Sequence, residues 1–228
     1  MHRLLSNISL QVNEKIYLKD PESSDLGRKI ICKGIDMIES MGFESFTFGK
    51  LAKEISSTEA SIYRYFENKH KLLLYLSSWY WAWLQYQLVF ALANVVCPHE
   101  RLEKAIVLLT KGAREDNTFT HINEKKLYRI IISESAKAYL NKEVDADNKE
   151  GMFLGYKELV LRISEIIKEI DPEFKYPRMM VSTVIEGAHH QRYFAEHLPR
   201  LTDQVEGEDA ITDFYRDMVF KALAEKAK

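Results

Sequence analysis

The chain has 228 residues, with 32 Lys and Arg against 34 Asp and Glu, so its formal net charge is -2. This length admits one domain or two with a substantial core, and 46% hydrophobic with 29% charged residues is an ordinary globular composition. The basic excess typical of nucleic-acid-binding chains is missing, since residues 1–71 carry 11 basic and 10 acidic side chains. Any nucleic-acid function must therefore be argued from a motif. The two cysteines, Cys32 and Cys97, have neither metal-ligand spacing nor a disulfide framework, so we expect reduced thiols, as in the cytoplasm.

Residues 1–20 show no signal-peptide pattern, because no cationic start is followed by an apolar run and a cleavage site. Apolar and polar residues alternate here, which weakly favours a short hairpin or an extended arm. Insertion of this arm into a DNA minor groove is one interpretation. We favour packing against the next domain, because Arg3, Lys15 and Lys19 are the only cations of the arm.

A first long helix is predicted to begin at Pro21 or Ser24 and to end near Met41, where Gly42 can take a left-handed cap conformation. Its apolar stripe consists of isoleucines at helical spacing, namely Ile30, Ile31, Ile35 and Ile38. We expect this helix to be the platform for the segment that follows.

Residues 46–73 predict two short helices, a tight corner and the start of a third helix. Thr47 can cap the first short helix, Thr58 the second and Asn68 the third. Helices of seven or eight residues are unstable alone, so this segment must dock on a neighbour. The second short helix presents small and polar side chains outward, with Tyr63 and Arg64 beside them. Two short helices with such a face are typical of a helix-turn-helix, which places short side chains in the major groove.

This segment resembles the tetracycline-repressor (TetR) family of bacterial transcription regulators over residues 26–73. The residues that carry the resemblance are Gly42, Phe43, Thr47, Leu51, Ala52, Thr58, Ile62, Tyr63, Arg64, Tyr65, Phe66, Asn68, Lys69, Leu72 and Leu73. The resemblance implies an all-α fold, in which a three-helix DNA-binding head over residues 21–71 precedes a larger helical effector-binding and dimerisation domain over residues 72–228. It also implies a ligand-responsive homodimer that binds a palindromic double-stranded operator, most often as a repressor.

Two features depart from the family pattern. Residues 55–58 read Ile-Ser-Ser-Thr where the family usually has a glycine and a buried valine, and Ala60 stands where glycine is frequent. Glu59 brings a negative charge to a position that is often polar or basic. It can accept from cytosine, or it can simply favour the amino-terminal end of its helix dipole, and both interpretations remain open.

The motif and the groove argument together give the expected DNA contacts. Thr47, Tyr63, Tyr65 and Lys69 are expected at phosphates, and residues 58–61 at base edges. The full set of predicted DNA-binding residues is Thr47, Lys50, Thr58, Glu59, Ala60, Ser61, Tyr63, Arg64, Tyr65 and Lys69.

From Leu72 to Pro98 the chain has no charged residue. The length admits a membrane span, but five Ser, Gln and Asn side chains interrupt the run, and a central helix of a bundle is favoured. Its aromatic stripe is either core or the wall of a pocket for a small apolar effector. The candidate pocket residues are Trp79, Trp83, Tyr86, Tyr128 and His189.

The rest of the chain reads as further helices, the last two over about residues 176–197 and 208–227. The resemblance implies that these two pair with their copies across a two-fold axis, with interface candidates Met180, Val184, Gln191, Phe194, Ile211, Phe214 and Met218. We expect no metal site, because His189 and His190 point to different faces. Residues 145–150 fail as a calcium loop because Lys149 and Glu150 occupy its ligand and glycine positions.

No catalytic triad order, phosphate-binding loop or metal-ligand set is present, so we expect neither an enzyme nor a cofactor. The predicted protein is a cytoplasmic DNA-binding regulator without a membrane anchor. The alternative is a membrane-associated or otherwise non-DNA-binding helical protein.

Overall fold

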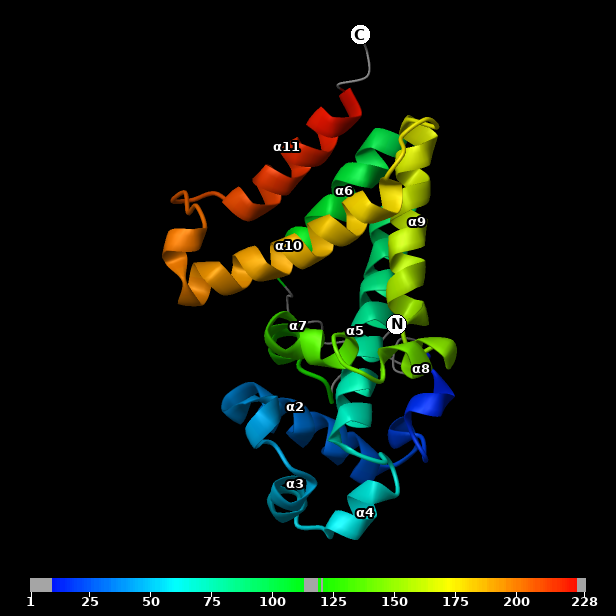
Figure 1. The fold of residues 1–228 in the computed structure, drawn as a ribbon, viewed down its shortest axis with the longest axis vertical. Helices are drawn as coiled ribbons and strands as arrows, with labels where there is room; N and C mark the ends of the chain where they lie inside the picture. Colours follow the sequence, from blue (N-terminus) through cyan, green and yellow to red (C-terminus); the bar gives the residue numbers. More distant parts are fainter. Residues whose placement is uncertain (1–9, 113–118, 120, 225–228) are drawn as a thin grey trace. The chain divides into compact units, whose positions relative to one another are not determined.

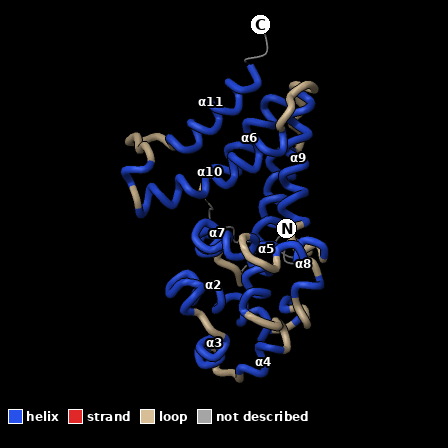
Figure 2. The backbone as a smooth tube through the Cα atoms, in the orientation of Figure 1, coloured by secondary structure: helices blue, strands red, loops and turns tan. Residues whose placement is uncertain are grey.

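The computed structural model describes residues 10–112, 119 and 121–224. In these ranges every regular element is a helix, and Figure 2 shows no strand. The predicted all-α fold is therefore confirmed. The chain divides into two compact units, residues 1–82 with 113–154 and residues 83–112 with 155–228 (Figure 1).

The first unit contains the predicted head. Its elements are the 3-10 turns η1 (Glu14–Ile16) and η2 (Pro21–Ser23) and the helices α2 (Asp25–Ser45), α3 (Phe48–Glu54), α4 (Glu59–Tyr63), the first part of α5 (Lys69–Leu92), α7 (Glu124–Tyr139) and α8 (Val144–Lys149). The helix α8 overlaps residues 145–150, the segment that was rejected as a calcium loop.

The platform helix α2 begins after Ser24, whose hydroxyl accepts a hydrogen bond from the backbone N–H of Gly27 at 3.1 Å. Its predicted isoleucine stripe is buried: Ile30, Ile31, Ile35 and Ile38 are each at most 1% exposed. Gly42 has a φ of 77°, so it takes the positive φ expected of it, although the helix resumes for one short turn to Ser45.

The helix α7 is joined to α2 by ion pairs along one side. Lys126 Nζ lies 2.6 Å from Asp36 Oδ1, and Arg129 Nη1 lies 2.8 Å from Glu39 Oε1. The hydrogen bond from Lys126 to Asp36 raises the pKa of Lys126. At the end of α2 the carboxylate of Glu134 accepts from the backbone N–H of Phe43 at 3.0 Å. The kink at Gly42 is thus held by α7 as well as by α2 itself.

The second unit contains the last part of α5 and the helices α6 (Pro98–Thr110), α9 (Leu154–Ile170), α10 (Pro177–His197) and α11 (Ala210–Ala224), with the 3-10 turn η3 (Pro199–Leu201). A Cβ on Gly187 would collide with the hydroxyl of Tyr215, so glycine permits the close approach of α10 and α11. Arg192 of α10 joins its helix to the end of α6 and to the residue before α11. It donates to the backbone carbonyl of Thr110 at 2.9 Å and to both carboxylate oxygens of Asp209.

The division into units differs from the predicted boundary at residue 72. It falls within α5, and α7 and α8 belong to the unit of the head. The reason is the set of contacts that α7 makes with α2, which no local sequence pattern displays.

The uncharged segment from Leu72 onward forms most of α5, and its first half is buried on all sides, as expected for a central helix. No helix in the described ranges combines the length and apolarity that a membrane span requires.

Candidate nucleic-acid interface

The two short helices of the motif are capped as the sequence predicts. Thr47 Oγ1 accepts from the backbone N–H of Lys50 at 3.2 Å, and Thr58 Oγ1 accepts from that of Ser61 at 3.2 Å. Asn68 Oδ1 accepts from the backbone N–H of Lys71 at 2.9 Å, which caps α5. Each helix therefore begins at a hydroxyl or amide oxygen that replaces a missing intrahelical partner.

The corner between α3 and α4 is closed without a glycine. Ser56 has a φ of 53°, the left-handed conformation in which glycine is normally favoured. The backbone N–H of Ser57 donates to the carbonyl of Ala52 at 2.9 Å, and that of Ser56 donates to the carbonyl of Lys53 at 3.2 Å. This pair of bonds is the Schellman motif. The unusual Ile-Ser-Ser-Thr corner thus keeps a standard helix end, with serine in the strained position.

Apolar side chains lock the two short helices onto the rest of the head. Phe46, Leu51, Ile62 and Phe66 are 0% exposed. Phe48 is also buried, and its ring meets that of Tyr63 edge-on, with centroids 5.1 Å apart. The ring of Tyr63 is thus oriented by packing although the side chain is 46% exposed.

Most predicted DNA-binding residues lie on the surface of α3 and α4. The exposed members are Thr47, Lys50, Thr58, Glu59, Ala60, Tyr63 and Arg64, and Ser61 is partly exposed. The amino-terminal half of α4 therefore presents a face of short side chains, with a phenol and a guanidinium after it. The Glu59 carboxylate lies close to Gly49 of α3: a Cβ added to Gly49 would be 3.4 Å from Glu59 Oε2. Lys50 donates to the carbonyl of Ser45 at 2.7 Å.

Two predicted phosphate contacts instead have partners inside the protein. Tyr65 is 3% exposed, and its hydroxyl lies 2.8 Å from that of Ser24 and 3.3 Å from Lys19 Nζ. The hydrogen bond with Ser24 lowers the pKa of Tyr65 despite its burial. Lys69 Nζ donates to the backbone carbonyls of Phe43 at 3.0 Å and Glu44 at 3.1 Å. Both side chains thus have partners inside the head.

The described part of the N-terminal arm packs on the head. Ile16 is 1% exposed, and the backbone N–H of Leu18 donates to the carbonyl of Tyr65 at 2.8 Å. Asn13 Nδ2 donates to the carbonyl of Glu150 at 2.9 Å. Residues 10–20 thus confirm the expected packing, but they form one 3-10 turn, η1, and no hairpin. Residues 1–9 lie outside the described residues.

The predicted pocket residues are divided between the units. Trp79 and Tyr128 belong to the first unit and are 2% and 7% exposed. Trp83 and His189 are buried in the second unit, where Tyr86 is partly exposed. Burial, together with the charge of the neighbouring His190, lowers the pKa of His189 to about 4, so the imidazole is neutral at pH 7.

The predicted dimer residues also separate by burial. Val184 and Ile211 are 2% and 8% exposed and belong to the core of their own chain, whereas Phe214 is 59% exposed. Met180, Gln191, Phe194 and Met218 are partly exposed. Other exposed apolar side chains between residues 176 and 205 were not predicted as interface residues; they are Tyr176, Met179, Leu198, Leu201 and Val205.

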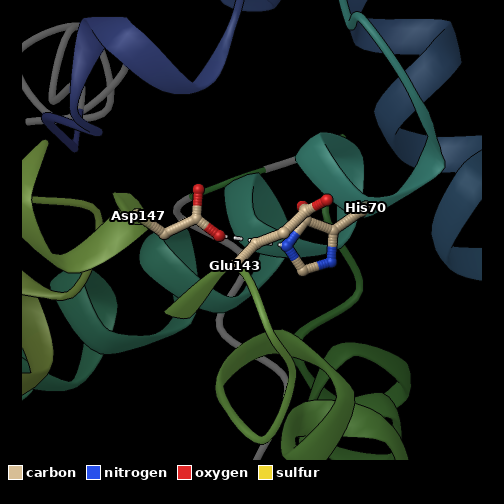
Figure 3. Close-up of side chains that lie close together, drawn as sticks. All are labelled: His70, Glu143 and Asp147. Atoms are coloured by element: carbon tan, nitrogen blue, oxygen red, sulfur yellow. Dashed lines mark hydrogen bonds and ion pairs between the residues drawn. The ribbon is translucent and has the colours of Figure 1, made fainter. Parts of the chain in front are cut away.

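A group of metal-ligating side chains in the first unit was not predicted from the sequence. His70, Glu143 and Asp147 each offer a ligand atom, and these atoms lie within 4.8 Å of one another (Figure 3). Glu143 precedes α8 and Asp147 lies within it, whereas His70 is the second residue of α5. The i, i+4 spacing of the two acids was a visible signal, but the histidine is 77 residues from Asp147.

Comparison with known proteins gives one family match. The model of bacterial regulatory proteins of the tetR family matches residues 30–76, which include α3, α4 and most of α2. No curated protein sequence matches the chain significantly.

Several solved structures share the fold. AibR in complex with isovaleryl coenzyme A and operator DNA has a TM-score of 0.55 at 19% identity, with 84% of this chain and 97% of that chain covered. The structure of the superantigen PfiT has a TM-score of 0.57 at 14% identity, with 92% of this chain and 100% of that chain covered. The structure of the ketosteroid transcriptional regulator KstR2 of Mycobacterium tuberculosis has a TM-score of 0.52 at 12% identity, with 96% of this chain and 98% of that chain covered. At such identities the likeness shows the fold alone, and a superantigen shares that fold with the regulators.

Proposed function

We propose that the chain is a cytoplasmic, homodimeric transcription regulator of the TetR family that binds a palindromic operator; the match of residues 30–76 to the family model supports this. The observation that carries the proposal is the capped pair α3 and α4, whose outer face combines short side chains with an exposed phenol and guanidinium. Short side chains admit α4 to the major groove, and the flanking groups suit phosphate oxygens.

In this proposal the residues of α4 divide between two roles. Glu59, Ala60 and Ser61 face base edges, with Thr58 at the helix start. Tyr63 and Arg64 hold phosphates, together with Thr47 and Lys50 at the start of α3. Tyr65 and Lys69 act indirectly, since they fix the helices that carry the contacts.

Two copies are required, because half-sites one helical turn apart are read by a two-fold symmetric dimer. Exposed apolar side chains on α10 and α11, among them Met179 and Phe214, support an interface in the second unit. We propose that this interface is isologous and that the regulator acts as a repressor, as is common in the family.

Control by a small apolar effector is the remaining part of the proposal. The aromatic side chains of α5 support an apolar site. AibR, which has a similar fold, supports control by an effector in general, because its structure holds isovaleryl coenzyme A together with operator DNA. A coupling free energy of about 1–3 kcal/mol between effector and operator changes DNA affinity about 5- to 150-fold.

The test is selection of DNA from a random pool by the purified protein, followed by sequencing and a salt titration of the enriched sites. Enrichment of a palindrome with half-sites about one helical turn apart is expected. Arg64→Ala should weaken binding to all sequences and reduce the slope of log affinity against log salt by about 1. The control Arg200→Ala changes an exposed arginine in η3 and should leave both unchanged.

The opposing outcome is the absence of any enriched sequence. It would assign the chain to proteins that keep the fold without reading DNA, as the non-DNA-binding alternative states. The near-neutral head and the negative charge of Glu59 would then be the physical explanation.

A further inference from the structure

The structure places one imidazole and two carboxylates together where α8 meets the first turn of α5. His70 Nε2 lies 3.2 Å from Asp147 Oδ2, and the Glu143 carboxylate approaches the same point. Figure 3 shows the three side chains converging from the two segments. All three residues belong to the first unit.

We propose that His70, Glu143 and Asp147 bind a divalent transition-metal ion. This inference goes beyond the proposed DNA-binding function and does not depend on it. An imidazole nitrogen with carboxylate oxygens suits ions such as Zn²⁺, Mn²⁺ or Co²⁺, whereas Ca²⁺ and Mg²⁺ prefer oxygen ligands alone. Three protein ligands leave at least one position of the ion open to water or to another ligand.

The distances fit an ion with little rearrangement. Around a tetrahedral ion with bonds of about 2.0–2.2 Å, ligand atoms lie about 3.4 Å apart. The His70 and Asp147 ligand atoms are already 3.2 Å apart. The ligand atom of Glu143 lies within 4.8 Å of those of His70 and Asp147. Because the Glu143 side chain is exposed, it can rotate toward the ion without displacing the core.

Asp147 is held in a fixed orientation by a residue that is not a ligand. Its side chain is 6% exposed, and Lys71 Nζ lies 3.0 Å from Oδ1, so Oδ2 alone faces His70. Outer contacts that orient a ligating carboxylate are a general property of metal sites.

The charges of the group also favour a cation. The group carries two carboxylates beside one ammonium, that of Lys71, so a divalent ion would balance the excess of acidic side chains. Lys71 lies beside the Asp147 carboxylate, and a bound ion would place a positive charge beside Glu143 as well. The position has a consequence for the fold: the ion would join α8 to the start of α5, directly after the helix-turn-helix.

The experiment is a cobalt titration of the full chain, prepared without a histidine tag, stripped with chelator and dialysed, with DNA absent. We expect visible d–d absorption that saturates at one Co²⁺ per chain and disappears on addition of Zn²⁺. Glu143→Gln and His70→Gln should each weaken binding by at least about tenfold, since losing even an outer contact of a metal ligand typically costs about 10- to 100-fold. Asp145→Asn, at an exposed acid of α8 outside the group, should change nothing.

Circular dichroism melting of each metal-free variant shows whether it folds. Glu143→Gln alters an exposed side chain and decides the question alone if His70→Gln is unfolded. Absence of saturable cobalt absorption in the wild type would overturn the proposal, and so would affinity unchanged by Glu143→Gln. Because the titration contains no DNA, its failure would leave the operator proposal untouched.

Discussion

The ammonium nitrogen of Lys69 lies 3.0 Å from the backbone carbonyl oxygen of Phe43 and 4.7 Å from the centroid of the Phe43 ring. The same nitrogen donates to the carbonyls of Glu44 and Phe46. The first residue of α5 thus satisfies carbonyls at the end of α2, where a cation is also favoured by the helix dipole. Lys69, which was predicted to contact a phosphate, therefore also has partners that support the helix-turn-helix.

Lys69→Met tests this role, because methionine keeps an apolar stem over Phe43 and removes all three hydrogen bonds. We expect the free energy of unfolding in urea to fall by about 1–3 kcal/mol. Lys50→Met is the control, since Lys50 is exposed and makes one such bond, to Ser45, so its loss should be smaller. Equal stabilities of the two variants would show that the Lys69 contacts contribute little.

Removing the hydroxyl group of Tyr65 and that of Tyr63 should have different effects, because only the first is buried. Tyr65→Phe removes a buried hydroxyl from Ser24 and Lys19, and should lower the free energy of unfolding by about 1 kcal/mol. Tyr63→Phe removes an exposed hydroxyl, and should leave stability within about 0.5 kcal/mol while weakening DNA binding. Urea denaturation and a binding titration on the selected operator distinguish them. A stability loss confined to Tyr63→Phe would reverse the assignment.

The corner at Ser56 predicts a stabilising substitution. A left-handed residue with a Cβ costs about 1–2 kcal/mol relative to its relaxed conformation, and glycine avoids most of this cost. Ser56→Gly should therefore raise the free energy of unfolding, by up to about 1 kcal/mol after the gain in unfolded-chain entropy is included. The neighbouring Ser57→Gly provides the control, because Ser57 has an ordinary φ and should lose stability. Urea denaturation measures both.

Local patterns predicted the elements of the head well because its signals are local. The caps Thr47, Thr58 and Asn68 act over three residues, and the isoleucine stripe of α2 repeats within one helix. The contacts that the sequence did not predict depend on residues far along the chain. Tyr65 meets Ser24 across 41 residues, and His70 meets Asp147 across 77, so only the folded structure brings these groups together.

The dimer prediction is tested most directly at Phe214, whose side chain on α11 is 59% exposed. Phe214→Glu would place a charge in an apolar interface and should convert the dimer to a monomer in analytical ultracentrifugation. Leu161→Glu on α9 is a matched control, because it adds the same charge at a 40% exposed leucine outside the predicted interface. A dimer that survives Phe214→Glu would place the interface elsewhere.

Buried His189 predicts a loss of stability in acid. Its pKa is lowered from 6.5 to about 4 in the folded chain, chiefly by burial, so between these values the unfolded state binds more protons than the folded state. Stability therefore falls as the pH drops below about 6.5 and levels off below about 4.

At pH 5 the cost of His189 amounts to about 2 kcal/mol, at about 1.4 kcal/mol per pH unit. His189→Gln has no titrating group at this position, and should lose about 2 kcal/mol less than the wild type between pH 7 and pH 5. Urea denaturation at the two pH values gives the difference, in which other titrating groups cancel. Parallel losses in the two proteins would show that His189 is protonated as easily in the folded chain as in the unfolded one.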